Sequence, residues 1–157
     1  MSRLQREVKK RNPFTSLPEE AHLNLARTSD RVGIQFERLF RGHGLTPSQY
    51  NILRILRGEG KPLPILEVAG RTVTTVPGIT GLIDRLERAK LVARRRCTED
   101  RRVVYVEITP QGLEILANLD EPVETLNQQI LGHLSDKELR ELIRLLEKIR
   151  AQEPRTQ

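Results

Sequence analysis

The amino-acid sequence predicts a mainly helical chain of the α+β class, in which one short β-hairpin interrupts a series of helices. Three observations support this prediction. Apolar residues recur at the helical spacing of three and four along most of the 157 residues. Threonine-proline or serine start signals precede several of these periodic stretches. A single pair of β-branched or alternating runs flanks a charged turn in the middle of the chain.

The charge distribution points to an anionic partner. Lysine and arginine number 27 against 21 aspartates and glutamates, which gives a net charge of +6 and an isoelectric point near 10.0. From Pro110 to Glu153 acidic residues outnumber basic ones, so the positive excess lies in the amino-terminal arm and in the arginine-rich middle. A localised excess of this kind is typical of a protein that binds nucleic acid.

Several classes of protein are disfavoured. The one cysteine, Cys97, excludes an intramolecular disulfide. The chain has no secretory signal and no apolar run long enough for a membrane span, so we expect a cytoplasmic protein without a membrane partner. The three histidines, His22, His43 and His133, lack metal-ligand spacing, and no catalytic motif is present. We therefore expect no metal, no cofactor and no enzymatic activity.

The amino-terminal part divides into an arm and a helix. Residues 1–17 form a basic arm, for which two interpretations remain open: a solvated tail, or an arm that touches DNA or clasps a second subunit. A long helix is predicted from Pro18 to Arg41, because a proline and two glutamates suit its first turn and two glycines follow its end. Its mixed apolar and polar faces favour a role in dimerisation.

The next two helices have the order expected of a helix-turn-helix. Thr46 and Gln49 form a predicted capping box around a proline, and the helix that follows is expected to end near Gly58. Residues 62–71 are predicted to form one short positioning helix, and residues 72–74 the turn.

A third helix is the candidate for reading DNA. Its apolar stripe is Ile79, Leu82, Ile83 and Leu86, which leaves small residues on the leading half of the outward face and charge on the trailing half. Small side chains let a helix backbone approach the floor of a major groove. The residues that we expect in the groove are Thr75, Pro77, Gly78, Thr80 and Gly81.

None of these groove residues can pair bidentately with a base, so discrimination is expected from apolar contacts, from the wing and from DNA shape. Thr75 is equally well interpreted as a helix cap. Arg85 either contacts a phosphate or pairs with Asp84 or Glu87 on its own helix.

A cationic hairpin follows this helix. The runs 92–96 and 103–108 flank a charged turn, and the first run carries Arg94, Arg95 and Arg96. Because side chains alternate across a strand, these arginines cannot all face DNA, and we expect one or two phosphate contacts, from Arg94 and Arg96. A reading helix beside a hairpin with a cationic tip is the arrangement of a winged helix-turn-helix.

Three segments, taken in order, carry a resemblance to a known family. They are LTPSQYNILRIL, TVTTVPGITGLIDRLERAKLVARR and EDRRVVYVEITPQG. Together they closely resemble the MarR family of bacterial winged-helix transcription regulators, from Glu19 to Arg150. The resemblance implies that Arg102 is a wing-tip arginine that enters the minor groove, oriented by Asp100, with Arg101 as the substitute.

The resemblance also implies an assembly. Helices are predicted from Thr109 to about Leu131 and after a capping box at Ser135, with a bend at Pro122. Their apolar surface exceeds what a small winged domain covers, so residues 18–44 and 110–153 are expected to form a helical dimerisation region around the winged helix-turn-helix region, residues 45–109.

Function follows from the same resemblance. We expect a homodimer that binds double-stranded DNA at a pseudo-palindromic promoter site, as a repressor relieved by a small-molecule effector. Candidate effector residues are His22, Arg27, His43 and Tyr50. The alternative is a constitutive architectural DNA-binding protein without an effector. Some relatives sense peroxides through a cysteine near the amino terminus, whereas Cys97 lies in the predicted wing and is interpreted as a small packed residue.

Overall fold

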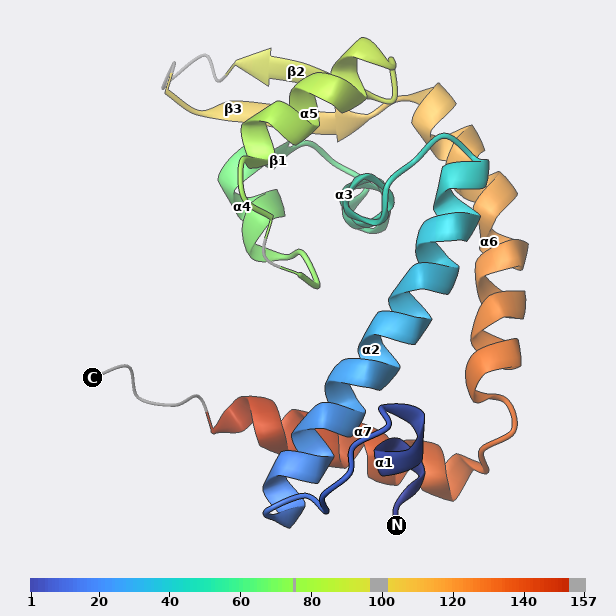
Figure 1. Ribbon diagram of the computed structural model, residues 1–157. Helices are drawn as coiled ribbons and strands as arrows, with labels where there is room; N and C mark the ends of the chain where they lie inside the picture. The colour runs from blue at the N-terminus through green and yellow to red at the C-terminus, as the bar shows by residue number, and fades with distance from the viewer. Residues whose placement is uncertain (75, 97–101, 153–157) are drawn as a thin grey trace. The chain divides into compact units, whose positions relative to one another are not determined.

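A computed structural model describes residues 1–74, 76–96 and 102–152 of the chain (Figure 1). It is mainly helical with one small antiparallel sheet, so the predicted fold class is confirmed. The chain divides into two units, Met1–Ala117 and a second that begins at Asn118, and each is described by itself. No helix among the described residues is both long and apolar enough to cross a lipid bilayer.

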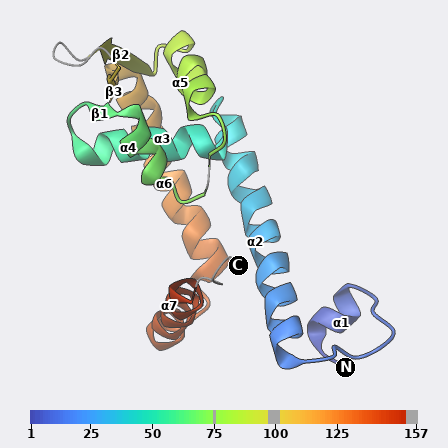
Figure 2. The same cartoon turned by 90° about the vertical axis from the view of Figure 1, so that its left-hand side faces the viewer.

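The amino-terminal arm is not simply a solvated tail. Helix α1 (Arg3–Glu7) is capped by Ser2, and its Leu4 side chain is only 3% exposed. The Glu7 carboxylate lies 3.7 Å from Arg27 Nε and 3.6 Å from a terminal nitrogen of Arg31, both on helix α2. Figure 2 shows α1 beside the amino-terminal half of α2. The arm is therefore docked through one buried leucine and one shared carboxylate.

Two helices then form as predicted. Helix α2 (Leu17–Gly42) is followed by helix α3 (Pro47–Glu59). The capping box of α3 is confirmed: the Thr46 amide donates to the Gln49 side chain at 2.8 Å, and the Gln49 amide donates to the Thr46 hydroxyl at 3.3 Å. The ring of Phe40 on α2 stacks on Tyr50 of α3, with 4.2 Å between centroids. Local start signals thus fix these helix ends.

The prediction of one helix over residues 62–71 is wrong. The segment divides into strand β1 (Leu63–Pro64) and helix α4 (Ile65–Gly70). The physical reason is the pair of prolines: a residue before proline avoids the helical region, so Leu63 is extended and pairs with Val106. The predicted hairpin consequently becomes a three-stranded sheet in the order β1-β3-β2.

The reading helix and the hairpin lie against each other. Helix α5 (Ile79–Arg88) packs on strand β2 (Val92–Arg96), which pairs with strand β3 (Val104–Ile108). The core beneath them consists of fully buried aliphatic side chains from α3, α4, α5 and the sheet. These are Ile52, Leu53, Leu56, Val68, Ile83, Leu86, Val92 and Val106.

A compact joint links the end of α5 to the start of helix α6 (Pro110–Leu131). The Thr109 hydroxyl donates to the Lys90 carbonyl at 2.7 Å and accepts from the Gly112 amide at 3.1 Å, while the Thr109 amide donates to the Leu91 carbonyl at 3.1 Å. A Cβ atom at Gly112 would overlap the Leu91 carbonyl oxygen and lie 2.7 Å from Ile108 Cγ1. Glycine is therefore required for this close approach.

The second unit contains the end of α6 and helix α7 (Asp136–Ala151). Helix α6 continues through Pro122. The capping box of α7 is confirmed, with the Ser135 amide donating to Glu138 at 2.8 Å. No residue of α7 is buried, although its sequence has a regular apolar stripe.

Candidate nucleic-acid interface

The amino-terminal end of α5 lacks the side chains that usually occupy the start of a helix. Its N-cap is Gly78, whose φ of 68° lies in the left-handed region, and no side chain caps the helix. The first turn contains no acidic residue. The first amides of a helix lack intrahelical partners and carry the positive end of the helix dipole, so they attract phosphate where no side chain occupies them.

The predicted groove residues lie at this end of α5, but not all are helical. Pro77 and Gly78 are exposed in the turn that precedes the helix, because the left-handed Gly78 delays its start to Ile79. Thr80 is exposed in the first turn and Gly81 is half-buried there, with open space around the position of its missing Cβ. Thr75 lies outside the described residues.

Arg85 lies one turn further along α5. Its side chain is exposed, and it makes no ion pair with Asp84 or Glu87, the two partners that its helix offers, within the described part of the chain. Both carboxylates pair instead with Arg94 on strand β2. The alternative of an intrahelical pair is thereby disfavoured, and the phosphate contact of Arg85 stays a prediction.

Arg94 lies differently from the expectation of a direct phosphate ligand. Its guanidinium forms ion pairs with Asp84 at 2.5 Å and Glu87 at 3.7 Å, and donates to the Thr80 carbonyl at 3.1 Å. The side chain is only 23% exposed. The reason is strand geometry, since Arg94 lies on the face of β2 that α5 covers, and the end of the strand at Arg96 extends into solvent.

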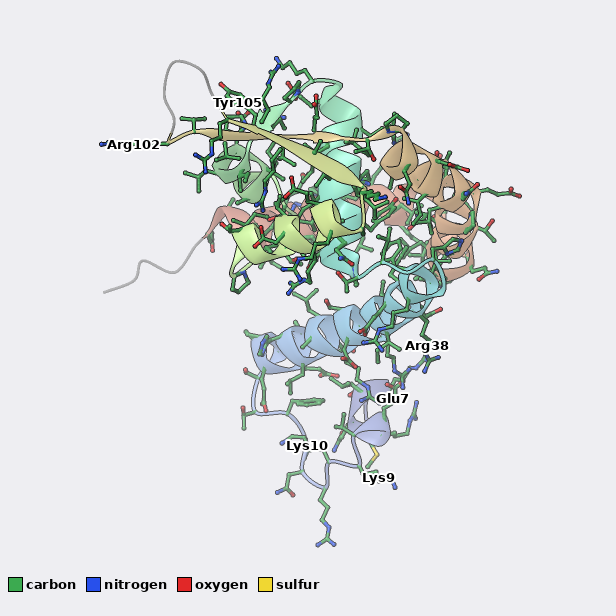
Figure 3. All side chains as sticks on the ribbon, turned by 90° about the horizontal axis from the view of Figure 1, so that it is seen from above. Glu7, Lys9, Lys10, Arg38, Arg102 and Tyr105 are labelled. Carbon is green, nitrogen blue, oxygen red and sulfur yellow. The ribbon has the colours of Figure 1, made fainter. Side chains whose placement is uncertain are left out.

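Among the described residues of the wing, the exposed arginines lie toward its tip. Arg95 and Arg96 are exposed at the end of β2, and Arg102 is exposed just before β3. Figure 3 shows the Arg102 side chain pointing away from the sheet. Asp100, Arg101 and Cys97 lie outside the described residues, so the predicted pairing of Asp100 with Arg102 and the packing of Cys97 stay predictions.

A groove of about 380 Å³ lies between α4, the start of α5 and the wing, and sequence reasoning missed it. Its lining is mostly aliphatic and also includes one threonine and two arginines. The lining residues are Pro64, Ile65, Leu66, Thr80, Arg94, Arg102, Val103 and Val104. The groove depends on β1, whose pairing with β3 has no local sequence signal.

An ion cluster links helices α3 and α4. Arg71, just after α4, pairs with Glu59 at the end of α3 at 2.6 Å and with Glu67 on α4. The Arg71 guanidinium, followed by Lys61, holds the pKa of Glu59 below its ordinary value, and Glu59 is the main cause that raises the pKa of Arg71. The pair ties α4 to α3 and so supports the elements behind α5.

The four residues expected to meet an effector do not converge within the chain. His22 and His43 lie near opposite ends of α2, about 30 Å apart at the rise of a helix. Arg27 pairs with Glu7, and Tyr50 stacks on Phe40. Among the described residues no group of three histidine, cysteine or acidic side chains is arranged to hold a metal ion.

Comparison with known proteins identifies relatives of this fold. The MarR family model matches residues 45–104. The transcriptional regulator FarR of Neisseria gonorrhoeae is 27% identical over 140 residues, covering 87% of this chain and 95% of FarR. The homoprotocatechuate degradative operon repressor of Escherichia coli is 30% identical over 112 residues, covering 71% of this chain and 75% of the repressor.

Solved structures agree with this relationship. A MarR transcription factor from Planctomyces limnophilus is 46% identical, with a TM-score of 0.68, and the alignment covers 86% of this chain and 98% of that one. Bordetella bronchiseptica BpsR, whose DNA binding is regulated by 6-hydroxynicotinic acid, is 27% identical with a TM-score of 0.78, covering 90% and 100%. The chain therefore belongs to the MarR family of winged helix-turn-helix transcriptional regulators.

Proposed function

We propose that this chain is a homodimeric transcriptional repressor that binds a pseudo-palindromic promoter site and releases it when a small organic ligand binds. The amino end of α5 enters the major groove, and the wing contacts the adjacent minor groove. Of the relatives named above, FarR and the Planctomyces limnophilus protein are transcription regulators, and the Escherichia coli relative is a repressor.

The observation that carries the proposal is the uncapped, acid-free start of α5 beside the exposed arginines. The first-turn amides suit a phosphate, and Thr80 and Gly81 present little bulk to the groove floor. Arg85 is exposed further along α5, and Arg96 is exposed at the end of β2. Such a surface binds the DNA backbone through several phosphates and reads sequence partly through groove shape.

Exposed apolar side chains support the homodimer. On α7, Ile143 is 54% exposed and Ile149 is 60% exposed, and on α2 Leu25 is 41% exposed. A regular apolar stripe that stays in contact with water is costly, and a second copy would remove it from solvent. A two-fold dimer carries two copies of α5, which predicts half-sites about 10 base pairs apart.

The ligand response is supported by analogy with BpsR, whose DNA binding is regulated by 6-hydroxynicotinic acid. The homoprotocatechuate operon repressor likewise has a name that refers to aromatic degradation. We propose an aromatic acid of this class as the effector. It would act by favouring a dimer in which the two reading helices are wrongly spaced for the operator.

Selection of bound sequences from genomic fragments by the purified protein tests the proposal. We expect enrichment of an inverted repeat whose halves are one helical turn apart. A matched control is the double variant Arg85→Ala and Arg96→Ala, which should lose enrichment while its circular dichroism spectrum stays unchanged. Absence of any enriched sequence for the wild-type protein would refute the proposal.

The effector part has a separate test. A panel of hydroxylated aromatic acids is added to the protein bound to its selected site, and release is followed by fluorescence anisotropy. We expect one or more members to lower the affinity at least tenfold. If every member leaves DNA affinity unchanged, the constitutive architectural binder becomes the better description of this chain.

A further inference from the structure

We propose that Asp84 and Arg94 form a latch that fixes the wing against the reading helix, and that both act as positioning residues for DNA binding. The proposal deepens the function proposed above and depends on it. Its unusual feature is that a carboxylate on the face that meets an anionic partner raises the affinity for that partner.

The latch joins helix α5 to strand β2, which follow each other in the chain with residues 89–91 between them. The Arg94 guanidinium contacts α5 at three points, which are the Asp84 carboxylate at 2.5 Å, the Thr80 carbonyl at 3.1 Å and the Glu87 carboxylate at 3.7 Å. A planar guanidinium with several fixed acceptors has little freedom to rotate. The contact therefore sets both the distance and the angle between β2 and α5.

The register of the sheet turns this local contact into control of the wing. Arg94 pairs across the ladder with Val106, whose side chain is fully buried, so this rung is anchored in the core. Beyond it, Arg95 and Arg96 pair with Tyr105 and Val104. The wing thus extends from the core beginning at Arg94. The contacts of Arg94 with α5 therefore set the orientation of the exposed arginines that follow it.

The latch contacts the first two turns of α5, the part of the helix that we propose faces DNA. Thr80 lies in the first turn of α5, and Asp84 lies one turn later on the same side. The guanidinium spans this turn from the wing side. A shift of the wing would pull on the same turn that presents Thr80 and Gly81 to DNA.

The state of Arg94 argues against a direct role in DNA binding. Its side chain is 23% exposed, its Nε atom is buried, and that atom has no hydrogen-bond partner within the described residues. A guanidinium that is already paired with two carboxylates would have to exchange them for a phosphate. Positioning is therefore the role that its contacts support.

Asp84→Asn distinguishes a positioning role of the latch from a simple effect of charge, because the two predict opposite changes in DNA affinity. The variant raises the net charge of the DNA-binding face by one. If charge alone matters, or if Arg94 is released to contact a phosphate, DNA affinity rises. If the latch positions the wing, DNA affinity falls although the surface is more positive.

The experiment measures affinity for the selected operator by fluorescence anisotropy over a range of salt concentrations. We expect Asp84→Asn to weaken binding about tenfold. The matched control is Glu107→Gln, which makes the same change in charge at an exposed position on β3 without a latch contact and should bind as tightly as wild type or slightly tighter. The exchange of both residues, Asp84→Arg with Arg94→Asp, should recover part of the loss.

The outcomes are distinct. The latch is overturned if Asp84→Asn binds the operator as tightly as wild type or tighter. It is also overturned if the double variant with exchanged charges recovers no affinity although its thermal midpoint equals that of Asp84→Asn. If the wild-type protein binds no duplex, the proposed function fails instead. The latch is then judged by amide hydrogen exchange of residues 102–106, which we expect to speed up in Asp84→Asn but not in Glu107→Gln, and equal rates would refute it.

Discussion

The winged region and the terminal helices contain similar leucines and isoleucines but use them differently. In the winged region Ile52, Leu53 and Ile83 are completely buried. Helix α7 buries no residue at all, and the 26 residues of α2 bury only Phe40. An apolar stripe in the sequence thus predicts that one face of a helix is buried. It does not show whether that face packs against the same chain or against another. The winged region completes its own core, whereas the terminal helices leave apolar side chains exposed, as expected for the proposed dimer.

The largest expected effect is within the winged region. Ile83→Ala removes a fully buried side chain from α5 and should lower the free energy of unfolding by about 2–5 kcal/mol. Urea denaturation measures it. Leu66→Ala is the control, because Leu66 is 82% exposed and should change stability by less than about 0.5 kcal/mol. An equal loss of unfolding free energy in both variants would contradict the view that the winged region has a complete core of its own.

A substitution in α7 tests the other side of the comparison. Ile143→Glu places a charge in the apolar stripe and should raise the dimer dissociation constant about a hundredfold, or roughly 3 kcal/mol. Sedimentation velocity measures the shift from dimer to monomer. Arg140→Glu also adds an acidic group to α7 but lies outside the stripe, so it should remain a dimer. A wild-type monomer would refute the need for a partner.

The wing is expected to contribute less. Arg102→Ala should weaken binding to the selected operator by about 1–3 kcal/mol and leave the dimer intact. Fluorescence anisotropy with the same duplex measures the loss. Arg140→Ala removes one positive charge from α7 instead, and should have little effect at moderate salt. If Arg102→Ala binds like wild type, Arg102 has no role in the interface.

The smallest expected effect concerns the docked arm. The Arg3 side chain, assisted by Arg31 and Arg27, holds the pKa of Glu7 below its ordinary value. Arg3 lies on α1 itself, so only the contributions of Arg31 and Arg27 on α2 stabilise docking; they act at neutral pH and are lost as the pH falls through the folded pKa. We expect the methyl resonances of Leu4 to report the release on acidification.

The same release is expected at neutral pH in Glu7→Gln, with faster tryptic cleavage after Lys9 and Lys10. Glu114→Gln serves as the control, because that side chain is exposed on α6. A cleavage rate that is equal in wild type and Glu7→Gln would show that the carboxylate does not hold the arm.

Features with local causes were predictable from the sequence. The capping boxes at Thr46 and Ser135 fix helix starts because all their contacts lie within three residues. The stripe of α5 identified its buried face correctly. Strand β1 was not predictable, because Leu63 becomes a strand only by pairing with Val106, which is distant in the chain.

The candidate site was predictable in part for a similar reason. Alternation along β2 showed that its three arginines cannot share one environment, but it could not show which of them faces α5. A signal was present in the sequence, because Asp84 and Glu87 place two carboxylates on one side of α5, and the strand arginine nearest to them would be neutralised. Such a cross-element pair becomes visible only when the packing of the strand on the helix is known.

The joint at Thr109 and Gly112 has a consequence for protein engineering. Thr109 bonds to both Lys90 and Leu91, and Gly112 leaves no space for a side chain, so the first turn of α6 belongs structurally to the winged region. A chimera that exchanges carboxy-terminal helices between regulators would disrupt this joint if its crossover lay between residues 109 and 112. A crossover after Ala117, where the first unit ends, would leave the joint intact.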